Sequence, residues 1–312
     1  MSITILRTVD AWWVRTPSGA APIDTDATTT AELLADHDRI QAALATVDTV
    51  DPDSLELVSP VTAPCRVVAQ MTNYASHVQD SGFDPETVPL TFFRKTSGSI
   101  SGPYDDVVRP AHVRFLDYEA EIGLVIGRTL AVGTDVTADS WASFIAGLVV
   151  TNDVSARDVQ LPKTQFYESK SYPSFTPTGP ALVLLDVDEL KRFGDLRLRL
   201  WVNGEPRQNA VVDGDMVYPP LEALQSLSRF QQLDPGDLLL TGTPVGTALS
   251  APSRPIQIIA SLLPPATKWK VFFKKQAQNR KYLKHGDIVE IAIGTDDGAI
   301  DLGHQRTVVR GT

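Results

Sequence analysis

The 312-residue chain has a single cysteine, Cys65, and no run of apolar residues near 18 in length. One cysteine excludes an internal disulfide and a cysteine-based zinc site, and it is typical of a reducing compartment. Without a long apolar run, no membrane-spanning helix is expected. The opening MSITILRTVDAWWVRT has no basic segment followed by an apolar stretch and a cleavage site, so it does not resemble a signal peptide. We therefore expect a cytoplasmic protein with no membrane partner.

Positive charge is also scarce, because the formal net charge is −10 and the pI is about 5.0. An acidic chain is a poor binder of nucleic acid, and we expect no nucleic-acid partner. The exception is the basic segment, Lys268 to Lys284, which has no acidic residue and interleaves four aromatic ones. Its simplest interpretation is a surface loop or short amphipathic helix against the body. The alternative is a lid or partner contact that favours an anionic ligand.

Several familiar catalytic motifs are missing. The chain has no GxSxG nucleophile elbow, no Walker A motif, no GxGxxG after a strand and no HExxH. A serine hydrolase, a P-loop NTPase and a dinucleotide-dependent enzyme therefore receive little support. The chemistry has to come from other residues.

The chain divides near residue 65. Residues 1–65 combine strand-like alternation with a helical pattern at 28–48 and end in the Pro-rich DPDSLELVSPVTAP, so we expect a small N-terminal α/β domain. Residues 66–312 hold mostly short strands, with one helical segment at 218–230. Strands that do not alternate with long helices disfavour Rossmann and TIM folds. The expected fold is α+β, mostly β, a mixed β-roll or barrel with few helices.

The stretch LDYEAEIGLVIG, residues 116–127, alternates as a half-buried strand does, but its second face begins with three acids. Glu119 and Glu121 project from the same side of the strand, about 7 Å apart. Like charges at that spacing repel, so an opposing charge is needed. Asp153 follows the apolar run AGLVV and sits at the end of another expected strand.

These three carboxylates would make a hard-oxygen site for Mg²⁺ or Mn²⁺ if they converge. Three protein ligands leave about three of six positions for water and substrate, which is the open arrangement of a catalytic ion. The alternative is that Glu119 and Glu121 face solvent while Asp153 caps a turn. Spacing alone leaves both interpretations open.

Among the five histidines, only His77 lies in a setting that suggests catalysis. Asp80 follows three residues later, on the same face of one helical turn. There it would orient the imidazole and stabilise its charged form, as in a water-activating dyad. The alternative is an ordinary surface histidine in a helical turn.

In order along the chain, the motifs NYxxH, FxRK, LDYEAEIGLVIG, NDVSARDVQ, KSYPSFTPTGP, VNGEPRQ and LDPGDLLLTGTPVG resemble the fumarylacetoacetate hydrolase family. The resemblance covers about residues 66–247, with a weaker tail from 283. It implies a mixed β-roll core, a homodimer, and a bound Mg²⁺, Mn²⁺ or Ca²⁺. It also implies a small 2-oxo or 1,3-dicarbonyl acid as substrate.

The resemblance assigns roles residue by residue. The metal ligands are implied to be Glu119, Glu121 and Asp153. The other implied site residues are Arg157 and Gln160, which face the substrate; Lys170, which approaches its oxygens; Thr243, which holds its carboxylate; and the water-activating His77 with Asp80. Asp117, on the same face as the glutamates, stays outside the ligand set, and Asp117→Asn should leave metal binding largely intact.

The sequence departs from the family pattern in three places, and the third, in the tail, bears on substrate choice. The acid after the histidine is Asp80, where relatives often have the longer glutamate, and the usual GLNY is Met71 to Tyr74 here. A long, partly basic segment at about 248–282 replaces a short loop, and the closing G-x-L-x-N strand is degraded at 301–305.

The resemblance implies a metal-dependent hydrolase that cleaves a C–C bond in an acylpyruvate- or fumarylpyruvate-like acid. His77 would activate water, and the metal would hold the enolate that leaves. A first alternative is an isomerase, like that of the homoprotocatechuate pathway, or an oxaloacetate decarboxylase. A second, of another class, is an inactive metal-binding scaffold that recruits a partner through the basic segment.

Overall fold

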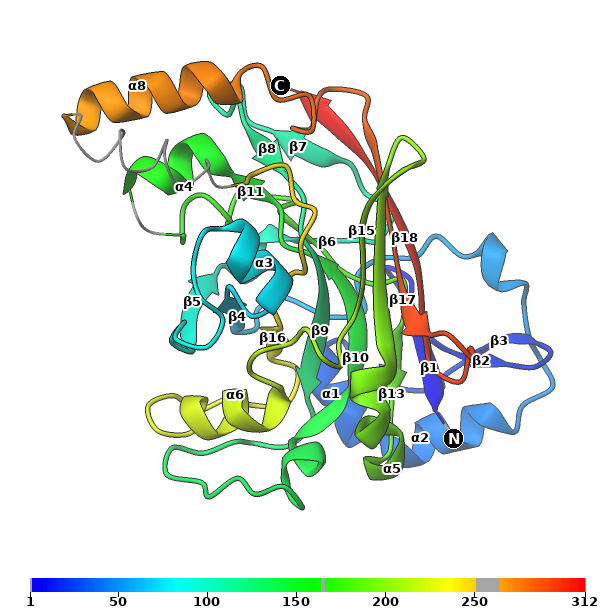
Figure 1. The fold of residues 1–312 in the computed structure, drawn as a ribbon. Helices are drawn as coiled ribbons and strands as arrows, with labels where there is room; N and C mark the ends of the chain where they lie inside the picture. Colours follow the sequence, from blue (N-terminus) through cyan, green and yellow to red (C-terminus); the bar gives the residue numbers. More distant parts are fainter. Residues whose placement is uncertain (1, 164–165, 251–263, 312) are drawn as a thin grey trace.

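The computed structural model describes residues 2–163, 166–250 and 264–311. Strands hold 33% of the chain and helices 22%, so the mostly β fold with few helices is confirmed (Figure 1). Within the described ranges, no helix is both long and apolar enough to cross a membrane.

The larger sheet has nine strands, and β9 and β10 lie near its middle. Neighbouring strands are antiparallel except β16 and β4, which are parallel. From one edge to the other, the order is β3 (Gly19–Pro22), β2 (Trp12–Thr16), β1 (Ile3–Arg7), β13 (Leu182–Leu184), β10 (Ile145–Asn152), β9 (Ala120–Ile126), β16 (Leu238–Leu240), β4 (Val67–Met71) and β5 (Thr91–Lys95).

The second sheet has five strands, in the order β15 (Glu205–Val211), β14 (Leu196–Val202), β17 (Ile288–Thr295), β18 (Asp301–Gly311) and β7 (Val107–Arg109). Two short pairs complete the strands: β11 (Ser155–Ala156) with β8 (Leu116–Asp117), and β12 (Thr176–Pro177) with β6 (Ile100–Ser101). Both larger sheets have two free edges, so neither closes into a barrel. The degraded tail motif still forms a strand, the eleven-residue β18.

The helices are short. They are α1 (Thr30–Ala35), α2 (His37–Leu44), α3 (Ala75–Asp80), α4 (Arg157–Lys163), α5 (Val187–Leu190), α6 (Pro220–Leu227) and α8 (Pro265–Gln276), with 3-10 turns η1 (Pro52–Ser54), η2 (Ser97–Ser99), η3 (Trp141–Phe144) and η4 (Lys191–Asp195). The Thr-rich start of the predicted N-terminal helix makes a capping box, in which the Thr29 side chain accepts from the Glu32 N–H and the Glu32 side chain accepts from the Thr29 N–H.

Strand β1 joins the N-terminal region to the main sheet. Ile5 pairs with Val14 of β2 on one side and with Leu182 of β13 on the other. The sheet therefore runs without interruption across the boundary expected at residue 65. The division into a 1–65 and a 66–312 domain stays a prediction.

The half-buried strand predicted for residues 116–127 is wrong in its burial. All seven residues of β9 are buried. One face packs in the main hydrophobic core, and on the other face Glu121 lies in an enclosed polar cluster while Val125 packs in a second hydrophobic cluster. At Gly123 a Cβ atom would lie 2.7 Å from the Val149 side chain, so the strands around β9 leave no room there. The acidic face thus looks into the protein and not into solvent.

Candidate metal centre and active site

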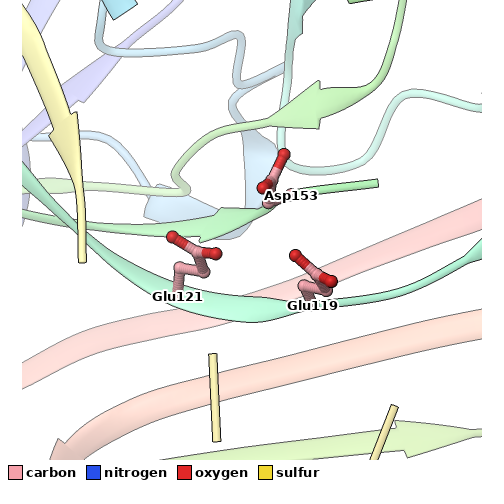
Figure 2. A group of neighbouring side chains, drawn as sticks. All are labelled: Glu119, Glu121 and Asp153. Atoms are coloured by element: carbon pink, nitrogen blue, oxygen red, sulfur yellow. The ribbon is translucent and has the colours of Figure 1, made fainter. Parts of the chain in front are cut away.

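The acidic cluster forms where β9 and β10 pair. Thr151 lies opposite Glu121 and Asn152 opposite Ala120, so Asp153, which follows β10, reaches the level of Glu119. Figure 2 shows the two glutamates projecting from one ribbon toward Asp153. Ligand oxygens of the three side chains lie within 4.8 Å of one another, and all three residues are buried. The predicted convergence is therefore present, and this buried triad is close enough to hold one metal ion.

Three buried cations surround the triad. The Lys170 ammonium lies 2.6 Å from Glu119 Oε2 and also pairs with Asp153 Oδ2. Lys95 donates to Asp153 Oδ1 at 2.5 Å and to the Phe175 carbonyl at 2.8 Å. Arg157 pairs with Glu119 Oε1 through one terminal nitrogen. Glu121 takes no part in these ion pairs, since no lysine or arginine in the described ranges forms an ion pair with it.

Sequence reasoning missed Lys95. It ends strand β5, directly after Arg94, where the sequence gives no sign that a lysine is buried, yet its side chain is 0% exposed. Burial lowers its pKa, and Asp153 opposes that effect. The only available signal was its place in the FxRK motif, to which no role was attached.

The charges in the cluster do not balance. Four buried carboxylates, Asp117 and the three of the triad, face three buried cations. The excess falls on Glu121, whose pKa is raised well above its ordinary value by burial and by the charges of Asp153 and Glu119. The Gly242 N–H, 2.8 Å from Glu121 Oε2, offsets this in part. A hard divalent cation fits such a site, because it prefers carboxylate oxygens and supplies the missing positive charge.

Arg157 and Gln160 lie together at the start of α4. Arg157 donates to Gln160 Oε1 at 2.9 Å and through Nε to Asp117 Oδ2 at 2.8 Å. All three side chains are buried. The structure thus brings together the two residues expected to face the substrate, and places Arg157 between Gln160 and Glu119.

His77 comes to the same site from α3. Its pKa is lowered mainly by burial, with Glu119 opposing and Arg157 adding to the effect. Its Nδ1 is buried and has no hydrogen-bond partner within the described part of the chain. Asp80 is on the same helix, but no hydrogen bond or ion pair joins it to His77 among the described residues. The role expected for Asp80 stays a prediction.

Thr243 is buried just after β16, near the start of β9, and is held by a residue that the sequence did not single out. Gln208 of β15 donates from Nε2 to Thr243 Oγ1 and to the Pro244 carbonyl, both at 2.8 Å. Its Oε1 accepts from the Ala120 N–H at 3.0 Å. Gln208 therefore ties the TGTP turn directly to the strand that carries the glutamates.

The basic segment begins as the helix α8 and packs on the body. Phe273 stacks on Phe115, with ring centroids 5.6 Å apart, and Tyr282 lies 5.1 Å from the same ring. Four lysines of the helix are exposed: Lys268, Lys270, Lys274 and Lys275. This agrees with an amphipathic helix against the body. The stretch 251–263 of the expected insertion lies outside the described residues.

Comparison with known proteins gives consistent matches. Residues 66–310 match the model of the fumarylacetoacetate (FAA) hydrolase C-terminal family. A mitochondrial oxaloacetate tautomerase of Rattus norvegicus is 34% identical over 210 residues, which are 67% of this chain and 65% of that protein. A 2,4-didehydro-3-deoxy-L-rhamnonate hydrolase of Sphingomonas sp. is 33% identical over 259 residues, 80% of each chain.

Among solved structures, a probable 2-hydroxyhepta-2,4-diene-1,7-dioate isomerase of Mycobacterium abscessus is similar over 100% of this chain and 99% of its own. The TM-score is 0.75 and the sequence identity 30%. This likeness extends through the N-terminal strands as well as the part that matches the family model.

Proposed function

Because the chain belongs to the fumarylacetoacetate hydrolase family, we propose that it is a metal-dependent hydrolase of a C–C bond in an acylpyruvate-like 1,3-dicarbonyl acid. The observation that carries the proposal is the buried triad, in which Glu121 has no ion-pair partner among the described residues, together with a buried histidine beside it whose pKa is lowered by burial. Family members include tautomerases, isomerases and hydrolases that act on small acids.

Glu119, Glu121 and Asp153 would hold the ion, with Mg²⁺ or Mn²⁺ as the expected metal and Ca²⁺ as a further candidate. The chemistry that it supplies when bound is Lewis-acid stabilisation of negative charge on the 2-oxo oxygen of the substrate. Thr243 would hold the substrate carboxylate. Arg157 and Gln160 would line the rest of the acid.

His77 would take the proton from the attacking water through its unpartnered Nδ1 or its other ring nitrogen. Water adds to the distal carbonyl, and Lys170 and Gln160 would stabilise the oxyanion that forms. The C–C bond then breaks, its electron pair goes to the 2-oxo acid fragment as an enolate, and protonation releases that acid. Asp80 would orient His77 only after a rearrangement that brings the two side chains together.

A tautomerase, isomerase or decarboxylase is the second candidate. Two observations favour it: the rat relative is named as an oxaloacetate tautomerase, and no hydrogen bond from Asp80 orients His77 among the described residues. None of these reactions needs an attacking water. Activity that survives in His77→Ala would therefore support this candidate over the hydrolase.

The deciding experiment is a substrate panel with Mg²⁺ and with Mn²⁺. Acylpyruvates, fumarylpyruvate and oxaloacetate are assayed for pyruvate release, for CO₂ release and for loss of the enol absorbance. We expect pyruvate from an acylpyruvate, and loss of turnover after EDTA treatment. Full turnover in EDTA would refute the metal-dependent proposal. Tautomerisation without pyruvate release would refute the hydrolase and support a tautomerase.

A homodimer and a cytoplasmic location are proposed with the function. Light scattering on the purified protein tests the first, and fractionation of cells that produce it tests the second. A monomer at micromolar concentration would refute the homodimer.

A further inference from the structure

Asp117 is the best-satisfied carboxylate near the site. It is 0% exposed. Oδ1 accepts from the Ala248 N–H at 2.7 Å and the Tyr118 N–H at 2.9 Å. Oδ2 accepts from the Leu249 N–H at 3.0 Å and from Arg157 Nε at 2.8 Å. Both oxygens are thus committed to fixed donors, which makes Asp117 a rigid anchor for the Arg157 guanidinium.

The residues that hold Asp117 are in turn held by the inserted segment. Asn279, just after α8, donates from Nδ2 to the Ala248 carbonyl at 2.8 Å. The Leu283 N–H donates to the Leu116 carbonyl at 2.9 Å, next to Asp117. In Figure 1, α8 lies at the same end of the molecule as β8 and α4. Residues 279–283, which we call the bracket, therefore form hydrogen bonds both to the 248–249 segment and to strand β8.

Aromatic packing keeps the bracket in place. Tyr282 is buried against Phe115 and donates from its hydroxyl to Gln276 Oε1 at 2.9 Å. The route from the insertion to the site is short: Asn279 to the Ala248 peptide, Ala248 to Asp117, and Asp117 to Arg157.

We propose that Asn279 and Asp117 are positioning residues, through which the bracket fixes Arg157 and Gln160 and so sets the affinity for the substrate acid. The inference rests on the proposed function, since it takes Arg157 and Gln160 to face the substrate. It also gives a role to residues 279–283, at the end of the segment that replaces the expected short loop: they support the residues that hold Asp117. Neither residue touches the reacting atoms.

The isosteric change Asn279→Asp tests the route. It keeps the side-chain shape and the oxygen that accepts from the Lys281 N–H, but places a carboxylate oxygen against the Ala248 carbonyl. Gln278→Glu is the matched control, because it adds the same charge one residue away on an exposed side chain. Asn279→Ala serves if the aspartate variant does not fold.

The measurements are calorimetric titration of Mn²⁺ into each protein, titration of oxalate into the Mn²⁺-loaded protein, and steady-state kinetics on the best acylpyruvate. For Asn279→Asp we expect about tenfold weaker oxalate binding and a similar rise in KM. We expect kcat and the Mn²⁺ dissociation constant to change less than about twofold, and Gln278→Glu to match wild type. The oxalate arm needs no turnover, so it still tests the bracket if the hydrolase proposal fails.

A double-mutant cycle with Asp117→Asn separates positioning from a general loss of stability. Because Asn279 acts through Asp117, the second change should add little to the loss of oxalate affinity caused by Asp117→Asn. Equal oxalate affinity in Asn279→Asp and Gln278→Glu, or additive losses in the cycle, would overturn the proposal. Wild-type protein that binds Mn²⁺ but no oxalate would overturn both the bracket and the proposed substrate class.

Discussion

At the scale of single residues, the chemistry depends on which buried group carries a charge. Lys95, Lys170 and Arg157 each pair with one or two carboxylates, and of the four buried carboxylates in the cluster only Glu121 has no such pair among the described residues. A buried charge without compensation is costly, so the removal of one partner of a buried ion pair in this cluster should lower the stability of the protein. Two predictions concern individual members of the cluster.

The first prediction concerns how the activity that depends on His77 changes with pH. Burial lowers its pKa below the ordinary 6.5, so the imidazole stays neutral and able to accept a proton at pH values where a free histidine is protonated. We expect kcat/KM for hydrolysis to hold steady as the pH falls through 6.5 and to drop only when the lowered pKa is reached. His77→Ala should lose about 100- to 10,000-fold in kcat.

The measurement is the pH profile of kcat/KM in wild type and His77→Ala, with the Mn²⁺ affinity of both. The variant should bind Mn²⁺ as wild type does, because His77 is not in the triad. A wild-type acid limb at or above pH 6.5 would contradict the assignment of His77 as the base.

The second prediction concerns the contribution of Lys95 to stability. Lys95→Met removes a buried ammonium from Asp153, so we expect the metal-free protein to lose about 3–5 kcal/mol of stability. Saturating Mn²⁺ should restore much of that loss, since the ion takes over the charge compensation of Asp153. Urea unfolding with EDTA and with Mn²⁺ measures both quantities, and the exposed Lys284→Met is the control. An equal loss with and without Mn²⁺ would mean that Asp153 is not a ligand.

At the scale of elements, the link between β4 and α3 is strained. Thr72 has φ 51°, a left-handed conformation that a β-branched residue adopts at a cost of about 1–3 kcal/mol. Asparagine tolerates this conformation much better, so Thr72→Asn should stabilise the protein by about 1 kcal/mol. Thermal unfolding measures the gain, with the exposed Thr87→Asn as control. No gain would mean that the surrounding contacts select threonine.

Strand and helix positions were largely predictable. Alternation located β9, the apolar run before Asp153 located β10, and the helical pattern at 218–230 located α6, because each pattern follows from local geometry. What alternation could not show is that the second face of β9 is also buried. A strand with acids on one face is ordinarily exposed there, and only tertiary packing encloses this one.

The candidate site was predictable in its acids but not in its counter-ions. Glu121 lies on β9, Glu119 directly before it and Asp153 directly after β10, and the sequence pattern located both strands. Lys95 is on β5, which is separated from β9 by β16 and β4 in the sheet, so no local signal connects it with Asp153. Gln208 and Asp117 were missed as supports for the same reason: their partners lie in turns that are distant in sequence.

At the scale of the whole molecule, the continuous nine-stranded sheet decides how the protein unfolds. β1 is an interior strand, paired with β2 and β13, and Ile5 is 0% exposed in the core beneath it. An N-terminal unit that shares its sheet with the catalytic part cannot melt without exposing the edge of β13. We therefore expect both parts to unfold together.

Ile5→Ala tests this coupling. The truncation removes buried methyl groups, so it should lower the free energy of unfolding by about 2–5 kcal/mol. If the parts are coupled, the variant shows one transition, shifted as a whole, by tryptophan fluorescence and by loss of Mn²⁺ binding alike. Of the five tryptophans, Trp12 and Trp13 report on β2 and the other three on residues 66–312, while Mn²⁺ binding reports on the triad more than a hundred residues away from β2 in sequence. Two fluorescence transitions, of which only the one without loss of Mn²⁺ binding moves to lower denaturant, would instead support an independently folding domain at residues 1–65.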